Sequence, residues 1–145
     1  MLISRPIPYT TQMNNVIELE FGTIRIYENI LVSELNEGVL LDVESNRKIL
    51  QIGTEIFKEE GFGYISHRLN SYAVDPMVYR ESAEHPHLKA IAVVSKSEMS
   101  RKSAQLEKKF YTDKNPFQIF SCLEEAKTWI GDIVTANYAK ENSPS

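Results

Sequence analysis

The hydrophobic period of this chain changes once, close to Gly38, and this change limits the folds that the chain can adopt. Before it, apolar and polar residues alternate in three short segments, residues 16–21, 24–27 and 30–35. A period of two is typical of β-strands that are buried on one face. Because the connections between the segments are only two residues long, we expect three antiparallel neighbours in a meander.

After this point the period becomes helical. Residues 42–60 are predicted to form a helix, because Ile49, Ile52 and Ile56 recur on one face. Asp42 is suited to cap the N-terminus, where its side chain can accept a hydrogen bond from a free backbone N–H. Gly61 is suited to end the helix.

Beyond Gly61 strands and helices alternate. Residues 62–65 form a short predicted strand, and Asp75-Pro76 begins a second helix, with Asp as its cap and Pro at the first helical position. Residues 88–94 are apolar almost throughout, which is typical of a central strand buried on both faces.

Two more helices complete the pattern. Ser97 is predicted to cap a very polar helix that extends to Phe110, and the stripe Met99, Ser103, Leu106 and Phe110 is expected to face the core. Residues 116–121 form one more predicted strand. Ser121-Cys122-Leu123-Glu124 then matches a capping box that opens the last helix.

The predicted fold class is therefore α/β, with a mixed β-sheet that starts with an antiparallel meander and continues through alternating strand–helix crossovers. Residues 16–136 form the predicted single domain. Residues 1–15 are predicted to be a flexible N-terminal extension, and residues 137–145 a disordered tail. Two interpretations of the extension remain open: a native arm, or sequence upstream of a natural start at Met13.

Composition narrows the classes of function. The 145 residues carry a formal net charge of −4, with basic and acidic residues mixed along the chain, which does not favour nucleic acid as a partner. There is no apolar run of about 18 residues and no apolar N-terminal segment of a secretory signal, so we expect a cytoplasmic protein without a membrane span. An exposed edge of the meander would allow a homodimer.

No catalytic motif is visible, so we expect no enzyme and no cofactor. His85-Pro86-His87, with Glu81 or Glu84 nearby, could chelate a metal, but a polar loop is the favoured interpretation and no metal site is predicted. The single cysteine, Cys122, stands at a helix start and is expected to be an inert, partly buried thiol.

One loop combines several functional side chains. It follows a predicted strand and precedes a helix, where crevices for ligands form in open α/β sheets. Either the loop binds a partner, or Arg68 and Asn70 tie it down by bonding its backbone. The candidate binding or regulatory residues are Ser66, His67, Arg68, Asn70, Ser71, Tyr72 and Asp75.

The segments FGYISHRLNSYAVDP (62–76), LKAIAVVS (88–95), PFQIF (116–120) and LEEAKTWI (123–130) together resemble the STAS-like proteins of the SpoIIAA-like group. The resemblance covers residues 16 to about 134. It implies a fold related to bacterial anti-sigma-factor antagonists and to CRAL-TRIO lipid-transfer domains. In the antagonists a serine in the strand-to-helix loop is phosphorylated. Ser66 and Ser71 occupy that region here, but the usual Asp-Ser-Ser-Gly pattern is absent.

Two functions follow as hypotheses. The first is a non-enzymatic regulatory or protein-interaction domain that binds another protein through residues 66–76. The second is a carrier of a small apolar molecule or lipid. This hypothesis is suggested by the related fold and by the aromatic residues Phe62, Tyr64, Tyr72 and Tyr79.

Overall fold

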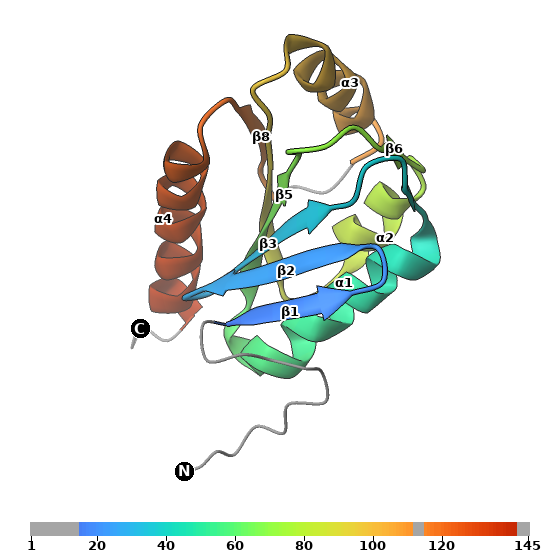
Figure 1. Cartoon of the computed structure of the whole chain (residues 1–145). Helices are drawn as coiled ribbons and strands as arrows, with labels where there is room; N and C mark the ends of the chain where they lie inside the picture. The colour runs from blue at the N-terminus through green and yellow to red at the C-terminus, as the bar shows by residue number, and fades with distance from the viewer. Residues whose placement is uncertain (1–14, 112–114, 142–145) are drawn as a thin grey trace.

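The structure, a computed structural model, describes residues 15–111 and 115–141, with side chains described to residue 136. The predicted extension, apart from Asn15, and residues 142–145 of the predicted tail lie outside the described residues. The chain has an α/β architecture (Figure 1), and its main sheet has six strands in the order β1-β2-β3-β5-β7-β8. The predicted fold class is confirmed.

The first half of the sheet is the predicted meander. β1 (Val16–Leu19), β2 (Gly22–Tyr27) and β3 (Ile30–Leu35) pair in antiparallel fashion. Their register places Ile17 opposite Ile24, so apolar side chains share one face of the sheet. β1 forms one edge of the sheet.

The second half of the sheet is parallel. β5 (Phe62–His67) pairs with β3, β7 (Leu88–Val94) with β5, and β8 (Phe117–Phe120) with β7. Every residue of β7 except Lys89 is buried, as expected for a central strand covered on both faces. A separate pair of short strands, β4 (Leu40–Leu41) and β6 (Ala73–Val74), lies outside the main sheet and was not predicted.

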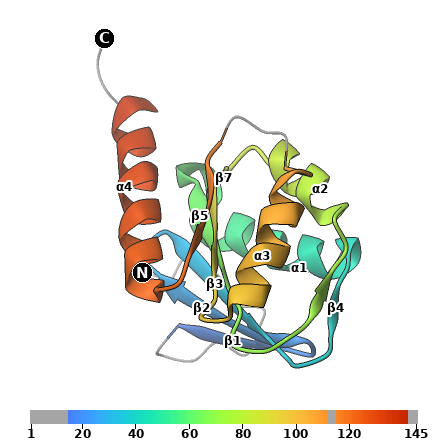
Figure 2. The same ribbon diagram turned by 90° about the horizontal axis from the view of Figure 1, so that it is seen from above.

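Helices cover both faces of the sheet (Figures 1 and 2). α1 (Val43–Phe57), α2 (Val78–Glu84) and α3 (Glu98–Lys108) contribute to one core cluster, and α4 (Leu123–Glu141) packs on the opposite face over Ile65, Ala90 and Ala92. α4 continues past the predicted domain end at residue 136. Within the described residues, no helix is long and apolar enough to cross a membrane.

The helix ends show how local sequence sets the boundaries. Asp42 accepts a hydrogen bond from the Ser45 backbone N–H at 2.8 Å, as predicted for an N-cap. The helical segment ends in a short 3-10 turn, η1 (Lys58–Glu60), followed by Gly61 at a φ of 84°. α2 begins two residues later than predicted, because the Asp75 carboxylate accepts the Met77 N–H in a turn before the helix.

The orientation predicted for α3 is wrong. Ser97 caps the helix as expected, by accepting the Ser100 N–H at 3.2 Å. The stripe that was expected to face the core contains Met99, Leu106 and Phe110, and all three are exposed. The buried residue of α3 is Ala104. The helix therefore contacts the domain through a narrow, largely polar stripe, and its apolar stripe faces outward.

Candidate functional site

The loop after β5 is fixed by a buried ion pair. Arg68 directly follows β5, and its side chain is 6% exposed. Its Nη1 donates to Glu107 Oε2 at 3.0 Å and its Nη2 donates to Glu107 Oε1 at 2.6 Å. Glu107 belongs to α3, so this two-point contact joins the loop to the helix that follows the next strand.

Neighbouring hydroxyl groups complete this network. Arg68 Nη2 also donates to Tyr79 Oη at 3.3 Å, and Tyr79 Oη donates to Glu107 Oε1 at 2.6 Å. Arg68 Nε donates to Ser66 Oγ at 3.2 Å, and Ser66 Oγ lies 2.7 Å from Tyr72 Oη. Four hydrogen bonds thus use the guanidinium, which leaves little of it to bind a ligand.

The pKa values in the network follow from burial and from the ion pair. Burial is the largest single effect and acts to lower the pKa of Arg68, but the hydrogen bonds to Glu107 and the electrostatic effects of Tyr72, Tyr79 and Glu107 together raise the pKa by more, so it lies above its ordinary value. Burial also raises the pKa of the Tyr72 and Tyr79 hydroxyls. Arg68 is therefore always charged, the two phenols are neutral at pH 7, and the network acts as a permanent brace.

The other predicted loop residues divide between two roles. Asn70 donates its side-chain amide to the Leu35 carbonyl at 2.9 Å, and the Ser71 N–H donates to Glu37 Oε1 at 2.9 Å. Ser71 is exposed, whereas Ser66 is buried. Asp75 forms the turn before α2. Both Asn70 and Arg68 hold the loop in place, as one of the two interpretations expects, but Asn70 bonds the backbone of β3 and Arg68 a side-chain carboxylate, and neither of these bonds is to the backbone of the loop itself.

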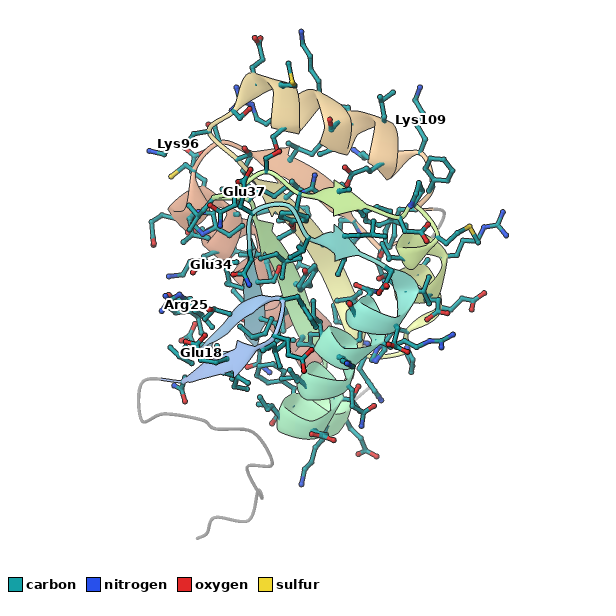
Figure 3. The ribbon with its side chains drawn as sticks, turned by 45° about the vertical axis from the view of Figure 1, so that its right-hand side comes forward. Glu18, Arg25, Glu34, Glu37, Lys96 and Lys109 are labelled. Atoms are coloured by element: carbon teal, nitrogen blue, oxygen red, sulfur yellow. The ribbon has the colours of Figure 1, made fainter. Side chains whose placement is uncertain are left out.

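His67 belongs to a different cluster. Its Nδ1 lies 3.2 Å from Glu34 Oε2, and Arg25 Nε donates to Glu34 Oε1 at 2.9 Å. Figure 3 shows Glu18, Arg25 and Glu34 along one side of the meander. Val32, two residues before Glu34, packs in the cluster below α4, so this charged row lies on the α4 side of the sheet.

An open crevice lies at the edge of the sheet where the connections after two neighbouring strands pass to opposite faces. β7 leads into α3 on one face, and its neighbour β8 leads into α4 on the other (Figure 2). Ligands in open α/β proteins bind at such points, beyond the carboxyl ends of the strands. Residues 67–69, 94–97 and 121–124 line a crevice of about 640 Å³ there.

The crevice has a mixed chemical character. Lys96 is exposed and the N-termini of α3 and α4 border the opening, which favours negative groups there, whereas the exposed carboxylate of Glu124 in the same lining opposes them. Leu69, Val94 and Leu123 supply apolar surface. Leu69 is 62% exposed and stands beside the braced Arg68.

Only part of this crevice was predictable from the loop. Residues 67 and 68 were predicted site residues, but Val94–Ser97, Ser121–Glu124 and the ion-pair partner Glu107 were missed. The available signal was the serine directly after each of two strands, Ser95 and Ser121, because connections that follow neighbouring parallel strands meet at one edge of a sheet.

The interior offers much less room. A hollow between α2 and the sheet, lined by Leu41, Tyr64 and Tyr79 among others, has a volume of about 10 Å³. That space matches about one water molecule. Tyr64 and Tyr79, which motivated the carrier hypothesis, are core residues here, and Ser33 Oγ lies 2.6 Å from Tyr64 Oη.

The remaining candidates have structural partners. His85 Nε2 lies 3.0 Å from Thr54 Oγ1, and His85 Nδ1 accepts the His87 backbone N–H. Within the described residues, no group of three or more His, Cys, Asp or Glu side chains could hold a metal ion. Cys122 is a partly buried free thiol.

Comparisons with protein-family models, with curated proteins and with solved structures found no match to this chain.

Proposed function

We propose that this chain is a non-enzymatic protein-interaction domain of regulatory type, whose partner binds at the carboxyl ends of β5, β7 and β8. The observation that carries the proposal is an exposed Leu69 at the rim of the crevice, on a loop held by the buried Arg68–Glu107 pair. Val94 and Leu123 line the same crevice, so Leu69 belongs to an apolar patch on a fixed, open surface, which is suited to a protein partner.

The bracing of the loop favours this use. Arg68, Asn70 and the Ser71 backbone each bond to a different part of the fold, namely α3, the end of β3 and Glu37. A loop that is already ordered loses little conformational entropy when a partner binds. The exposed residues 69–71 are therefore presented in one arrangement.

The resemblance to STAS-like regulators adds an expectation about control. In that class a loop serine is phosphorylated, and Ser71 is exposed whereas Ser66 is buried and bonded to Tyr72. We expect any such phosphate on Ser71. Phosphopeptide mapping of the chain isolated from its own cells tests this, and a phosphate on Ser66 would contradict it.

The main test is affinity capture from the native lysate, compared quantitatively between wild type and Leu69→Asp. Leu40→Asp is the matched control, because Leu40 is also an exposed leucine but lies on β4 and is not among the residues that line the crevice. The proposal expects at least one protein to be lost with Leu69→Asp and retained with Leu40→Asp. Equal recovery of every captured protein with wild type, Leu69→Asp and Leu40→Asp would overturn the placement of the binding surface at the crevice.

A second candidate function is the binding of a small molecule in the crevice. Its volume of about 640 Å³ lies within the range of small-molecule sites, and the bordering helix N-termini favour an anionic group. Native mass spectrometry of protein purified from its own organism separates the two functions. A bound mass that is lost in Leu69→Asp favours the small molecule.

A further inference from the structure

The outward face of α3 carries an apolar stripe that is not buried in the core. Met99 is 78% exposed, Leu106 62% and Phe110, just after the helix, 45%. Ser103 lies between them at helical spacing, so these residues follow one another along one face. Single exposed apolar residues are common, but three that share one helix face are typical of an interaction surface.

The reason for this orientation is the inner face of the same helix. Ala104 is small enough to let α3 approach the sheet, and Glu107 points inward to Arg68. The helix is therefore fixed by an ion pair and a small residue, and Met99, Leu106 and Phe110 are free to serve a partner.

The charge around the stripe is opposite to that of the chain as a whole. Residues 96–110 contain five basic residues (Lys96, Arg101, Lys102, Lys108 and Lys109) and two acidic residues (Glu98 and Glu107), a local net charge of +3 in a chain of formal net charge −4. Figure 3 shows Lys96 and Lys109 at opposite ends of α3. Within the described residues, Lys102 and Lys109 form no ion pair.

We propose that the outward face of α3 is a docking surface for an acidic, amphipathic segment of another protein. The apolar side of such a segment would cover Met99, Leu106 and Phe110, and its carboxylates would meet Lys102 and Lys109, which follow the stripe along one side at helical spacing. The inference rests on the proposed function in requiring a protein partner, but it does not require the crevice.

A second copy of this chain is the less favoured occupant. Antiparallel pairing of the stripe with itself would bring Lys102 and Lys109 against the same lysines of the other copy. Pairing of the stripe with the acidic remainder of another copy would be head-to-tail, and such contacts extend into filaments unless they close into a ring.

The test places the photo-reactive residue benzoylphenylalanine at position 106, 69 or 40 of the full chain in its native cells. Mass spectrometry then identifies what is linked at each position. Position 106 tests the α3 surface, position 69 tests the crevice, and position 40 is the control on β4. The charge-reversed variant K102E/K109E is compared with K48E/K58E, which makes the same charge change on α1 and η1.

The proposal expects position 106 to link to a peptide rich in Asp and Glu with apolar residues at helical spacing. It also expects K102E/K109E, but not K48E/K58E, to lower that yield about tenfold or more. A lipid, a second copy of the chain, a basic peptide or no adduct at position 106 would overturn it. If position 69 links to a protein and position 106 does not, the docking surface fails while the proposed function stands. No adduct at either position contradicts both.

Discussion

Arg68 and Glu107 join two segments that lie on opposite sides of β7 in the chain. Their two N–H···O contacts, 3.0 Å and 2.6 Å long, connect the end of β5 to the last turns of α3. The Arg68 side chain is almost fully buried, so its charge depends on Glu107 for compensation. Both proposed surfaces, the rim of the crevice and the outward face of α3, are held in place by this pair.

Removal of one charge of this pair should destabilise the domain strongly. Glu107→Gln keeps the size of the side chain but leaves the buried guanidinium without a counter-charge, which costs about 3–5 kcal/mol when a buried pair is broken. Urea denaturation measures the loss. Glu81→Gln is the control, because it breaks a similar two-point pair with the exposed Arg47 and should cost far less. Similar losses in the two variants would show that the Arg68–Glu107 pair is not the brace.

The reversed orientation of α3 gives a second prediction. Leu106→Gln should change the free energy of unfolding by no more than about 0.5 kcal/mol, since the side chain is exposed and glutamine is a good helix former. Ala104→Leu should cost about 1–3 kcal/mol, because it adds volume where α3 meets the core. A larger loss of stability for Leu106→Gln than for Ala104→Leu in thermal or urea denaturation would indicate that α3 has the orientation predicted from periodicity.

The contact between β5 and α4 gives a third prediction. A Cβ on Gly63 would overlap the Cγ2 of Ile130, so Gly63→Ala should cost about 1–3 kcal/mol. Gly131→Ala is the matched control in α4, where a Cβ meets nothing within 4 Å, and it should stabilise the helix by up to about 1 kcal/mol. Equal effects of the two substitutions in urea denaturation would contradict the close packing of Gly63 on Ile130.

His85 gives a prediction about pH. Burial, and then the neighbouring His87, lower the pKa of His85 below its ordinary value. The unfolded chain therefore takes up this proton first as the pH falls, so the contribution of His85 to stability is complete above a pH of about 6.5 and declines below it. Wild type should lose more stability than His85→Gln between pH 8 and pH 5.5. Parallel losses measured by denaturation at the two pH values would contradict this.

Local patterns predicted the parts of the fold that depend on local periodicity. Ile17 and Ile24 alternate with polar neighbours and pair across the meander, and residues 88–94 are apolar because both faces of β7 are covered. The caps Asp42 and Ser97 form within three residues of their partners. Signals of this kind are visible in a single sequence.

The features that were missed depend on contacts between distant residues. Periodicity shows that α3 has an apolar stripe but does not show which stripe faces the sheet, and here the partner that decides it, Arg68, lies 39 residues before Glu107. The crevice likewise needs the strand order, because residues 94–97 and 121–124 meet only when β7 and β8 are neighbours.

The most direct test of the proposed interaction surface is hydrogen–deuterium exchange of the full chain, alone and with a partner captured by wild type. We expect slower exchange on binding in residues 67–71, 95–97 and 121–124, which form the loop and the crevice. Unchanged exchange there, with protection instead at the opposite hollow around Glu28–Ile30 and Gly131–Thr135, would contradict it.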